Sequence, residues 1–382
     1  MDSNSRLKSA FPFFSNESIR KVLEDIDSIL RSGVLTDGPH VRDFEQRFAE
    51  YVDVKHAVAV NSGTAALESA LIHWKLKGKE VIVPTNTFVA TPYSVLFSGG
   101  KPVFADIRED TLCIDPNDVS CRISPRTAGV IVVHIAGLIC PQMNELAELC
   151  EERDLFLLED AAHATGAMID GRKAGALGDA GCFSFYPTKV ITTGEGGMMT
   201  TDCDELAEKA KCMRNHGLDS RNLMVMMGQN WRLSEIAAVI GKSQLADIDS
   251  FLLKRNEIAK EYEKQLRRTR GISLFKIPEN IRHSHYKYPV KVDDNLSASR
   301  LSHILRTKYH IETGNVYYPP CHLHPFFRRH LRNRNGFLPV AERVLRNILC
   351  LPIHVKMNRE DVEQVSNALG LGIDILQRSG SK

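Results

Sequence analysis

Apolar side chains recur at helical spacing near the start of the chain. A first helix is predicted by six such positions: Ile19, Val22, Leu23, Ile26, Ile29 and Leu30. Ser15 and Asn16 are its candidate N-caps, because a short polar side chain can accept a bond from the free N–H groups of a helix start. A second helix is predicted by four further positions: Val41, Phe44, Phe48 and Tyr51.

The pattern then changes to short apolar runs that alternate with helical stretches. Five of these runs predict buried strands: Ala57–Val60, Glu80–Val83, Pro102–Ala105, Gly129–Ile135 and Leu155–Leu158. Helical stretches follow Ser62, Thr87 and Pro141, and another helical run spans Ile236–Leu245. Alternation of this kind predicts an α/β domain with a largely parallel sheet.

From about Leu245 the pattern of apolar and charged residues along the chain changes. A long charged helix is predicted over Asp247–Leu266, followed by strand-like pieces at Ser273–Ile277 and Tyr286–Val292. Two more helices are predicted at Ser299–Lys308 and Arg359–Leu369, and proline-containing loops at Tyr317–Pro320 and Pro352. We therefore expect a large domain over residues 1–245 and a smaller α+β domain over residues 246–382.

Composition narrows the class of protein. The 382 residues suggest about two domains, and the formal net charge of +2 argues against a general nucleic-acid binder. The longest apolar runs fall far below the roughly 20 residues that span a bilayer. The nine cysteines are scattered without a CxxC pair, and the start of the chain is polar. We expect reduced thiols in a cytoplasmic protein, with no membrane or nucleic-acid partner.

Polar clusters follow several predicted strands, which is where open α/β sheets bind ligands. Asn61–Ala66 stands between a strand and a helix, and its small residues Ser62, Gly63 and Thr64 would let backbone N–H groups approach an anion. A tight turn with a helix cap explains the same residues. Glu159 and Asp160 follow another strand, and either acid would need a cation or hydrogen-bond donors there; a helix cap or an arginine pair is the alternative.

A third cluster places Lys189 after an apolar strand that ends near Ser184. Burial would lower the pKa of this lysine and make the neutral amine available for Schiff-base chemistry, although most lysines are merely solvated. A fourth cluster, Gly228–Glu235, precedes a helix and carries little information alone. Together the clusters supply what pyridoxal 5′-phosphate (PLP) requires: a lysine, an acid for the pyridinium nitrogen, a phosphate cup, and Phe88 as a ring to stack on it.

The chain resembles the DegT/DnrJ/StrS family of PLP-dependent sugar aminotransferases. The resemblance rests on motifs spread over nearly the whole chain: Thr36–Pro39, Asn61–Ala66, Glu159–His163, Ser184–Gly197, Asn230–Arg232, His322–Pro325 and Ala341–Glu342. It implies an α/β, aspartate-aminotransferase-like fold (PLP fold type I). The large domain would hold a mainly parallel seven-stranded sheet, and the C-terminal domain would be smaller and α+β.

The resemblance also implies roles for individual residues. Lys189 and Asp160 are the catalytic residues: Lys189 forms the Schiff base and then moves protons, and Asp160 holds the pyridinium nitrogen. His163 lies near the ring hydroxyl and Phe88 stacks on the ring. The phosphate is bound by four residues of the same chain: Ser62, Gly63, Thr64 and Ser184.

By the same resemblance, Asn230 reaches the phosphate in the neighbouring subunit, which implies a homodimer with shared active sites. One branch of the family has histidine in place of the lysine and performs dehydration, so Lys189 favours transamination here. The implied substrates are a keto-sugar, nucleotide-linked, and L-glutamate, in amino-sugar biosynthesis. A keto-cyclitol or other non-nucleotide keto-sugar is the alternative acceptor, and a regulatory protein that retains the fold is a remote one.

The sugar site is the least defined part. Tyr317, His322 and His324 lie in the stretch that family members place near the sugar. Arg328 and Arg329 open a basic tract, Arg328–Arg334, that would hold a diphosphate through paired guanidinium contacts or would simply be a solvated loop. Two histidines without a third ligand favour ordinary hydrogen bonds, so we expect no metal.

Overall fold

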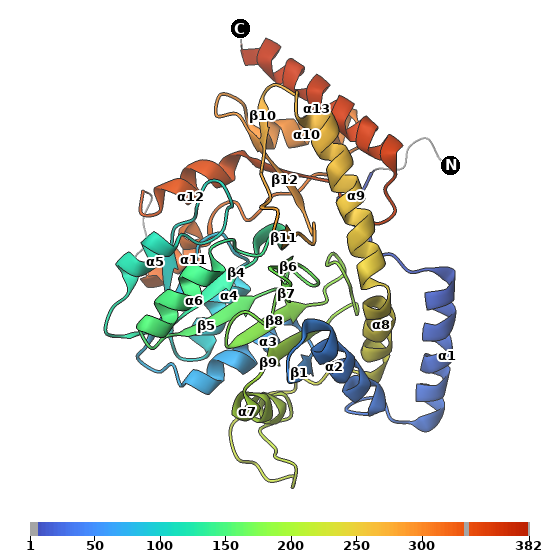
Figure 1. Cartoon of the computed structure of the whole chain (residues 1–382), viewed down its shortest axis with the longest axis vertical. Coiled ribbons are helices and arrows are strands. Elements are labelled where there is room, and N and C mark those ends of the chain that lie inside the picture. Colours follow the sequence, from blue (N-terminus) through green and yellow to red (C-terminus); the bar gives the residue numbers. More distant parts are fainter. Residues whose placement is uncertain (1–6, 332–335, 381–382) are drawn as a thin grey trace.

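A seven-stranded sheet forms the centre of the computed structural model, which describes residues 7–331 and 336–380 (Figure 1). The strands lie side by side in the order β1 (His56–Val60), β9 (Gly197–Thr201), β8 (Ala180–Ser184), β5 (Phe156–Asp160), β4 (Thr127–Val133), β2 (Glu80–Pro84) and β3 (Lys101–Ala105). β9 runs antiparallel to β1 and β8, and the other neighbouring strands are parallel. The predicted α/β class with a mainly parallel sheet is confirmed.

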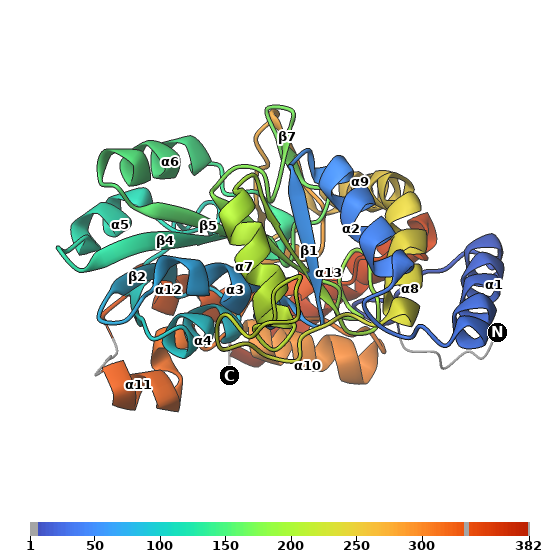
Figure 2. The same cartoon turned by 90° about the horizontal axis from the view of Figure 1, so that it is seen from below.

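Helices cover both faces of this sheet. They are α2 (Pro39–Val52), α3 (Gly63–Leu71), α4 (Ala90–Phe97), α5 (Pro116–Arg122), α6 (Met143–Glu152), α7 (Asp204–Arg214) and α8 (Glu235–Ala246), with a short turn of helix at η1 (Ile72–Trp74). Figure 2 shows α5 and α6 on one side of β4 and β5, with α3 and α4 on the other side. The parallel strands are therefore buried on both faces, which explains why they read as continuous apolar runs.

β4 ends two residues earlier than its apolar run predicted. The chain turns at His134 into the short helix η2 (Ile135–Gly137), where Ala136 has a φ of 57°. Ile135 and Ala136 are buried all the same. An apolar run can therefore continue past a strand into a buried turn.

The C-terminal part has its own core. α9 (Ile248–Leu266) leads to an antiparallel sheet of β10 (Ile272–Leu274), β12 (Tyr288–Val292) and β13 (Ile348–Leu351). α10 (Ala298–Lys308) and α13 (Arg359–Gly380) pack here, the latter longer than its predicted range. A third small sheet joins β11 (Ile281–Arg282) to β6 (Met168–Ile169) and β7 (Arg172–Lys173).

The segment between β12 and β13 returns to the large sheet. It contains η3 (Cys321–Leu323), α11 (Pro325–Leu331), α12 (Pro339–Val344) and η4 (Leu345–Asn347). Val316, Phe327 and Leu338 from this segment are buried in the same hydrophobic cluster as the central strands. The domain limits at residues 245 and 246 stay a prediction; that boundary falls between α8 and α9.

The first helix, α1 (Asn16–Ser32), is only half covered. Ser15 caps it as predicted, with its side chain accepting a bond from the Ser18 N–H. Ile29 is buried, but Ile19, Leu23 and Leu30 of the same apolar set are exposed. Figure 1 shows the helix at the edge of the molecule beside α8. Within residues 7–331 and 336–380, an apolar face of α1 is therefore left uncovered.

Two further observations concern the whole described chain. All nine cysteines are free thiols. No helix within residues 7–331 and 336–380 is long and apolar enough to cross a membrane.

Four phenylalanines join α2 to the sheet next to the site described below. Phe48 lies 4.9 Å from Phe183 and 5.6 Å from Phe185, measured between ring centroids, and Phe44 contacts Phe48 and Phe185. All four rings are fully buried. The cluster fixes the strand β8, from which the chain enters the site.

Phe48→Ala is expected to lower the free energy of unfolding by about 3–5 kcal/mol, because it removes a ring from a closely packed core and leaves a cavity. Chemical denaturation of the purified protein measures the change. Phe326→Ala, which truncates a phenylalanine on α11 that is 45% exposed, is the control and should change the value by far less. Equal losses for the two variants would contradict this account of the core.

Candidate active site

A cavity of about 530 Å³ opens where the strands of the large sheet end. Nine residues singled out by the sequence line it: Ser62, Gly63, Thr64, Phe88, Asp160, His163, Ser184, Lys189 and Tyr317. Tyr186, Thr188, Glu195, Tyr286 and Lys287 are among the further lining residues. The structure thus brings segments more than 250 residues apart in the sequence into one chamber.

The turn from β1 into α3 offers one wall with free backbone donors. Ser62 is the N-cap of α3, and its side chain accepts a bond from the Ala65 N–H. A Cβ on Gly63 would come within 2.8 Å of the Ser184 Cβ, so only glycine lets this turn lie against β8. The first N–H groups of a helix have no acceptor inside the helix, and the helix dipole favours an anion beside them. The residues fit a phosphate group.

Asp160 and Glu159 are neighbours on β5 and therefore point to opposite faces of the sheet. Asp160 faces the cavity, where its Oδ2 accepts a bond from the Thr91 hydroxyl at 2.7 Å and its Oδ1 one from the Ala162 N–H at 3.2 Å. Burial raises the pKa of the Asp160 carboxyl. A cation placed beside it would favour the ionised form, so the carboxyl fits a protonated ring nitrogen.

Glu159 faces the other way and is fully buried. Its Oε1 accepts the N–H groups of Leu177 and Gly178, and its Oε2 accepts that of Gly175 and the Nε2 of His134, all at 2.7–2.8 Å. His134 must carry its hydrogen on Nε2, because its Nδ1 accepts the Cys140 N–H. Four hydrogen-bond donors therefore stabilise the Glu159 carboxylate. This side chain holds neighbouring segments together and does not face the cavity.

His163 is held in one tautomer. Its Nδ1 accepts the Ala136 N–H at 3.2 Å, so the neutral ring carries its hydrogen on Nε2 and donates to the Tyr317 hydroxyl at 2.8 Å. The Tyr286 ring lies 4.2 Å from the imidazole between centroids. Burial lowers the pKa of His163 well below its usual value, with Lys189 and Lys287 adding to the effect. The imidazole is therefore neutral at neutral pH.

Lys189 lies in the turn that follows β8. Its N–H donates to the Tyr186 carbonyl, and its Nζ lies 4.8 Å from the centroid of the Tyr286 ring. The hydroxyls of Thr188 and Tyr286 are 3.0 Å apart, which ties this turn to the opposite wall. Burial lowers the pKa of Lys189 to about 8; the nearby charge of Lys287 also lowers it, and Asp160 acts in the opposite direction. The amine is thus easier to deprotonate than that of a solvated lysine.

A buried acid, a lysine with a lowered pKa and an anion-binding helix start meet in this one cavity. The sequence profile of the DegT/DnrJ/EryC1/StrS aminotransferase family matches residues 16–370. The chain belongs to this family. Membership confirms the resemblance seen in the sequence and the expected enzyme class, a PLP-dependent sugar aminotransferase, with the aspartate-aminotransferase-like fold.

Relatives and solved structures agree over nearly the full length. GDP-perosamine synthase of Caulobacter vibrioides is 36% identical over 375 residues, which covers 97% of this chain and 99% of that protein. The spore coat polysaccharide biosynthesis protein SpsC of Bacillus subtilis is 35% identical over 385 residues, covering 96% and 97%. The PLP form of the putative sugar aminotransferase Spr1654 from Streptococcus pneumoniae superposes with a TM-score of 0.90 at 26% identity, covering 97% and 100%.

Asn230 lies outside the cavity of its own chain. Its side chain is exposed, and its carbonyl accepts a bond from the Asn61 side chain at 3.3 Å. The Trp231 N–H donates to the Arg214 carbonyl, and the Trp231 carbonyl accepts the Asn61 N–H at 2.8 Å. The segment is therefore fixed beside the turn that starts α3, and Asn230 is not one of the described residues that line the cavity of its own chain.

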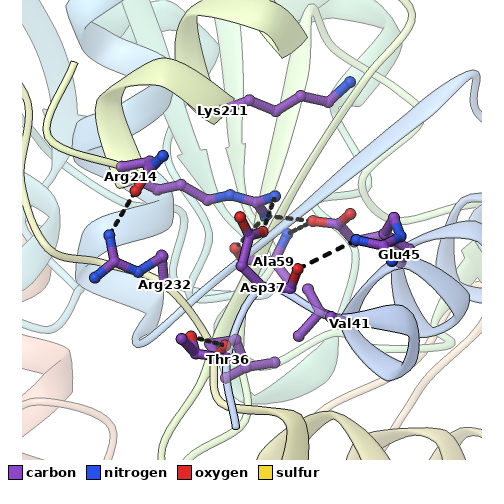
Figure 3. A network of polar contacts seen from close by, with 12 residues as sticks. Thr36, Asp37, Val41, Glu45, Ala59, Lys211, Arg214 and Arg232 are labelled. Carbon is purple, nitrogen blue, oxygen red and sulfur yellow. Dashed lines mark hydrogen bonds and ion pairs between the residues drawn. The ribbon is translucent and has the colours of Figure 1, made fainter. Parts of the chain in front are cut away.

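A polar network beneath this segment keeps it in place (Figure 3). Arg214, at the end of α7, donates to the Glu45 carboxylate on α2 and to the Ala59 carbonyl on β1 at 2.7 Å. Glu45 also accepts the Ala59 N–H at 2.8 Å. Arg232 donates to the Asn215 side chain, next to Arg214. The network joins three elements around the end of β1, where the cavity begins.

The other residues assigned to the sugar lie outside the cavity. His322 is buried between the Thr85 hydroxyl and the Glu342 carboxylate, at 2.7 Å and 3.2 Å. The Nε2 of His324 lies 3.2 Å from the Pro319 carbonyl. Arg328 and Arg329 are exposed on α11, and residues 332–334 of the basic tract lie outside the described residues. Their role in sugar binding stays a prediction.

Tyr286 and Lys287 were missed in the sequence. They lie within a stretch that predicted only a strand, and nothing in its pattern distinguishes an aromatic residue and a lysine that face a cavity. Their position depends on contacts remote in the sequence: the Lys287 N–H donates to the Ala136 carbonyl, and the Ser284 side chain donates to the His163 carbonyl. Only the folded chain shows that they belong to the site.

Glu159→Gln is expected to lower the free energy of unfolding by about 3–5 kcal/mol, because an amide NH₂ would face donors whichever way it turned. Asp160→Asn should change the stability far less, because burial already disfavours a charge at this position and the Thr91 hydroxyl can act as acceptor. Chemical denaturation without added cofactor compares the two adjacent substitutions. A larger loss for Asp160→Asn would reverse the roles given to the two acids.

Proposed function

We propose that the enzyme moves the amino group of L-glutamate to a nucleotide-linked keto-sugar, with PLP held in the cavity, as a step in amino-sugar biosynthesis. The observation that carries the proposal is the meeting of Lys189, Asp160 and the Ser62–Thr64 turn in one chamber. Each of these meets a different part of the cofactor. When bound, PLP supplies an aldehyde that reacts with amines and a ring that accepts electrons.

The walls of the cavity would hold the cofactor at four points. The N–H groups that begin α3, with the side chains of Ser62, Thr64 and Ser184, bind the phosphate. Asp160 binds the ring nitrogen and keeps it protonated, and the desolvated carboxylate and the ring cation stabilise each other. Phe88, at the mouth, stacks on the ring. His163 offers a neutral imidazole to the ring hydroxyl.

Lys189 acts as the amine that holds the aldehyde and as the base that carries the proton. Its lowered pKa keeps part of the amine neutral near physiological pH, and a group with such a pKa can both take and return a proton. The contact with the Tyr286 ring and the bond between Thr188 and Tyr286 limit its motion. Proton transfer and amine exchange are thus assigned to one side chain.

A nucleotide-linked acceptor is supported by the relative named GDP-perosamine synthase. Tyr317 is at the cavity wall, whereas Arg328 and Arg329 lie on an exposed helix that could contact a diphosphate outside it. An assay of nucleotide-linked keto-sugars and free keto-cyclitols with L-glutamate decides between the two acceptor classes. Amination of a free keto-cyclitol alone would overturn the nucleotide-sugar assignment.

We also propose that two copies form a homodimer with shared active sites. Exposed apolar side chains occur on three segments: on and just after α1, on α4, and shortly before Asn230. The following are examples: Leu23, Leu30, Val34, Leu35, Tyr93, Phe97, Leu223, Met224, Val225 and Met227. Exposed apolar patches are typical of protein interfaces. Asn230 is exposed and is not one of the described residues that line the cavity of its own chain, and it would complete the phosphate cup of the partner.

Cofactor uptake should depend on the ionisation of Lys189, since only the neutral amine attacks the aldehyde. We expect the rate at which cofactor-free protein gains PLP absorbance to rise with pH and to be half-maximal near pH 8, well below the 10.5 of a solvated lysine. Rapid-mixing absorbance measurements across the pH range test this. Lys189→Ala should show no reducible cofactor linkage and no transamination. A midpoint near 10.5 would contradict the role of burial.

Mixing two inactive variants tests the shared site. Lys189→Ala and Asn230→Asp should each be impaired alone, the first for lack of the amine and the second because a carboxylate repels the phosphate. In a mixed dimer one of the two sites combines an intact Lys189 with an intact Asn230. Random exchange of subunits makes about half of the dimers mixed, so about a quarter of wild-type activity should return. Lys189→Ala mixed with itself is the control. No recovery in proven mixed dimers would show that each site is built from one chain.

A further inference from the structure

Lys287 is a cation in the cavity that the cofactor does not use. Apart from Lys189, it is the only lysine or arginine among the described residues that line the chamber. Its Nζ donates to the Asn315 carbonyl at 2.6 Å and lies 5.3 Å and 5.7 Å from the ring centroids of Tyr317 and Tyr286. Within residues 7–331 and 336–380 it has no carboxylate partner. An ammonium at a cavity wall without a carboxylate partner is a favourable site for an anion.

The ammonium groups of Lys189 and Lys287 share one aromatic ring. Both lie within 6 Å of the centroid of Tyr286, so an anion at Lys287 would sit beside the amine that carries out the transfer. The backbone of Lys287 is fixed as well, because its N–H donates to the Ala136 carbonyl at 3.0 Å. The charge of Lys287 also lowers the pKa of Lys189, which agrees with this proximity.

We infer that Lys287 binds the α-carboxylate of the amino-acid donor. The inference rests on the proposed transamination. In an α-amino acid the carboxylate is bonded to the carbon that bears the reacting amine, so it must lie close to Lys189. In a nucleotide-linked sugar, by contrast, several bonds separate the diphosphate from the keto carbon. An anion site next to Lys189 therefore matches the donor and not the diphosphate.

The donor half of the reaction tests this inference without any sugar. The purified enzyme loaded with PLP is titrated with L-glutamate, with L-glutamine, which keeps the α-carboxylate, and with L-isoglutamine, which replaces it by an amide. The change in the cofactor spectrum gives an apparent dissociation constant and a rate for each amino acid. The wild type should bind L-glutamate and L-glutamine far better than L-isoglutamine.

Lys287→Met should weaken L-glutamate binding by about 10- to 100-fold, the range expected for a lost charge-assisted hydrogen bond, while L-isoglutamine binding changes little. Lys287→Arg should keep most of the preference for the α-carboxylate. Lys287→Gln repeats the test with a polar side chain, in case the methionine variant folds poorly. Lys173→Met is the matched control, because Lys173 is also a half-buried lysine over a tyrosine ring, that of Tyr51 at 4.9 Å, outside the cavity.

The possible failures can be told apart. Unchanged discrimination between L-glutamate and L-isoglutamine in both neutral variants would overturn the inference, as would a loss confined to the KM of a nucleotide-linked keto-sugar. If the wild type binds PLP but no amino acid alters its spectrum, the proposed transamination fails, and the inference fails with it. Equal weakening in the Lys173→Met control would also refute a specific role for Lys287.

Discussion

The candidate site depends on the burial of one carboxylate, that of Glu159, which faces away from the cavity. The Glu159 carboxylate on β5 accepts hydrogen bonds from three backbone N–H groups of the turn before β8 and from the ring of His134, which follows β4. It therefore links β4, β5 and β8 at one point. Because side chains alternate along a strand, fixing Glu159 on one face fixes Asp160 on the other. The position of Asp160, the acid proposed to bind the cofactor, is therefore set by a neighbour that points to the opposite face of the sheet.

A second constraint joins the C-terminal part of the chain to the same place. The segment Ser284–Lys287 bonds to Gly137, Ala136 and the His163 carbonyl, and so closes the cavity on the side opposite α3. The Ala136 N–H holds the tautomer of His163, and His163 in turn donates to Tyr317 from the C-terminal segment. A displacement of this segment would move Tyr286, Lys287 and Tyr317 together. The geometry around Lys189 is thus shared between both parts of the chain.

The sequence was sufficient where the pattern is local. The parallel strands, the helix after Ser62 and the lysine after an apolar strand are all visible as short motifs. β9 was missed, because Gly197–Thr201 begins with glycine and its antiparallel place depends on pairing with β1 and β8. The sequence alone could not show which face of the sheet Glu159 and Asp160 each point to, because this depends on the register of β5. Tyr286 and Lys287 are placed at the cavity by bonds to Thr188 and Ala136, which are remote in the sequence, and no local pattern records such contacts.

The charges in the cavity follow from these two constraints. In the proposed site, the phosphate of the cofactor would meet neutral donors at a helix start, where no side-chain cation is needed, and its protonated ring would meet Asp160. Lys189 would react with the aldehyde. What remains is the cation of Lys287, held by a carbonyl and two aromatic rings, which together cannot neutralise it. With the cofactor bound as proposed, the pocket would still carry a positive charge beside Lys189. Such a pocket is suited to an anionic second reactant, and an amino acid would provide that charge next to the bond that changes.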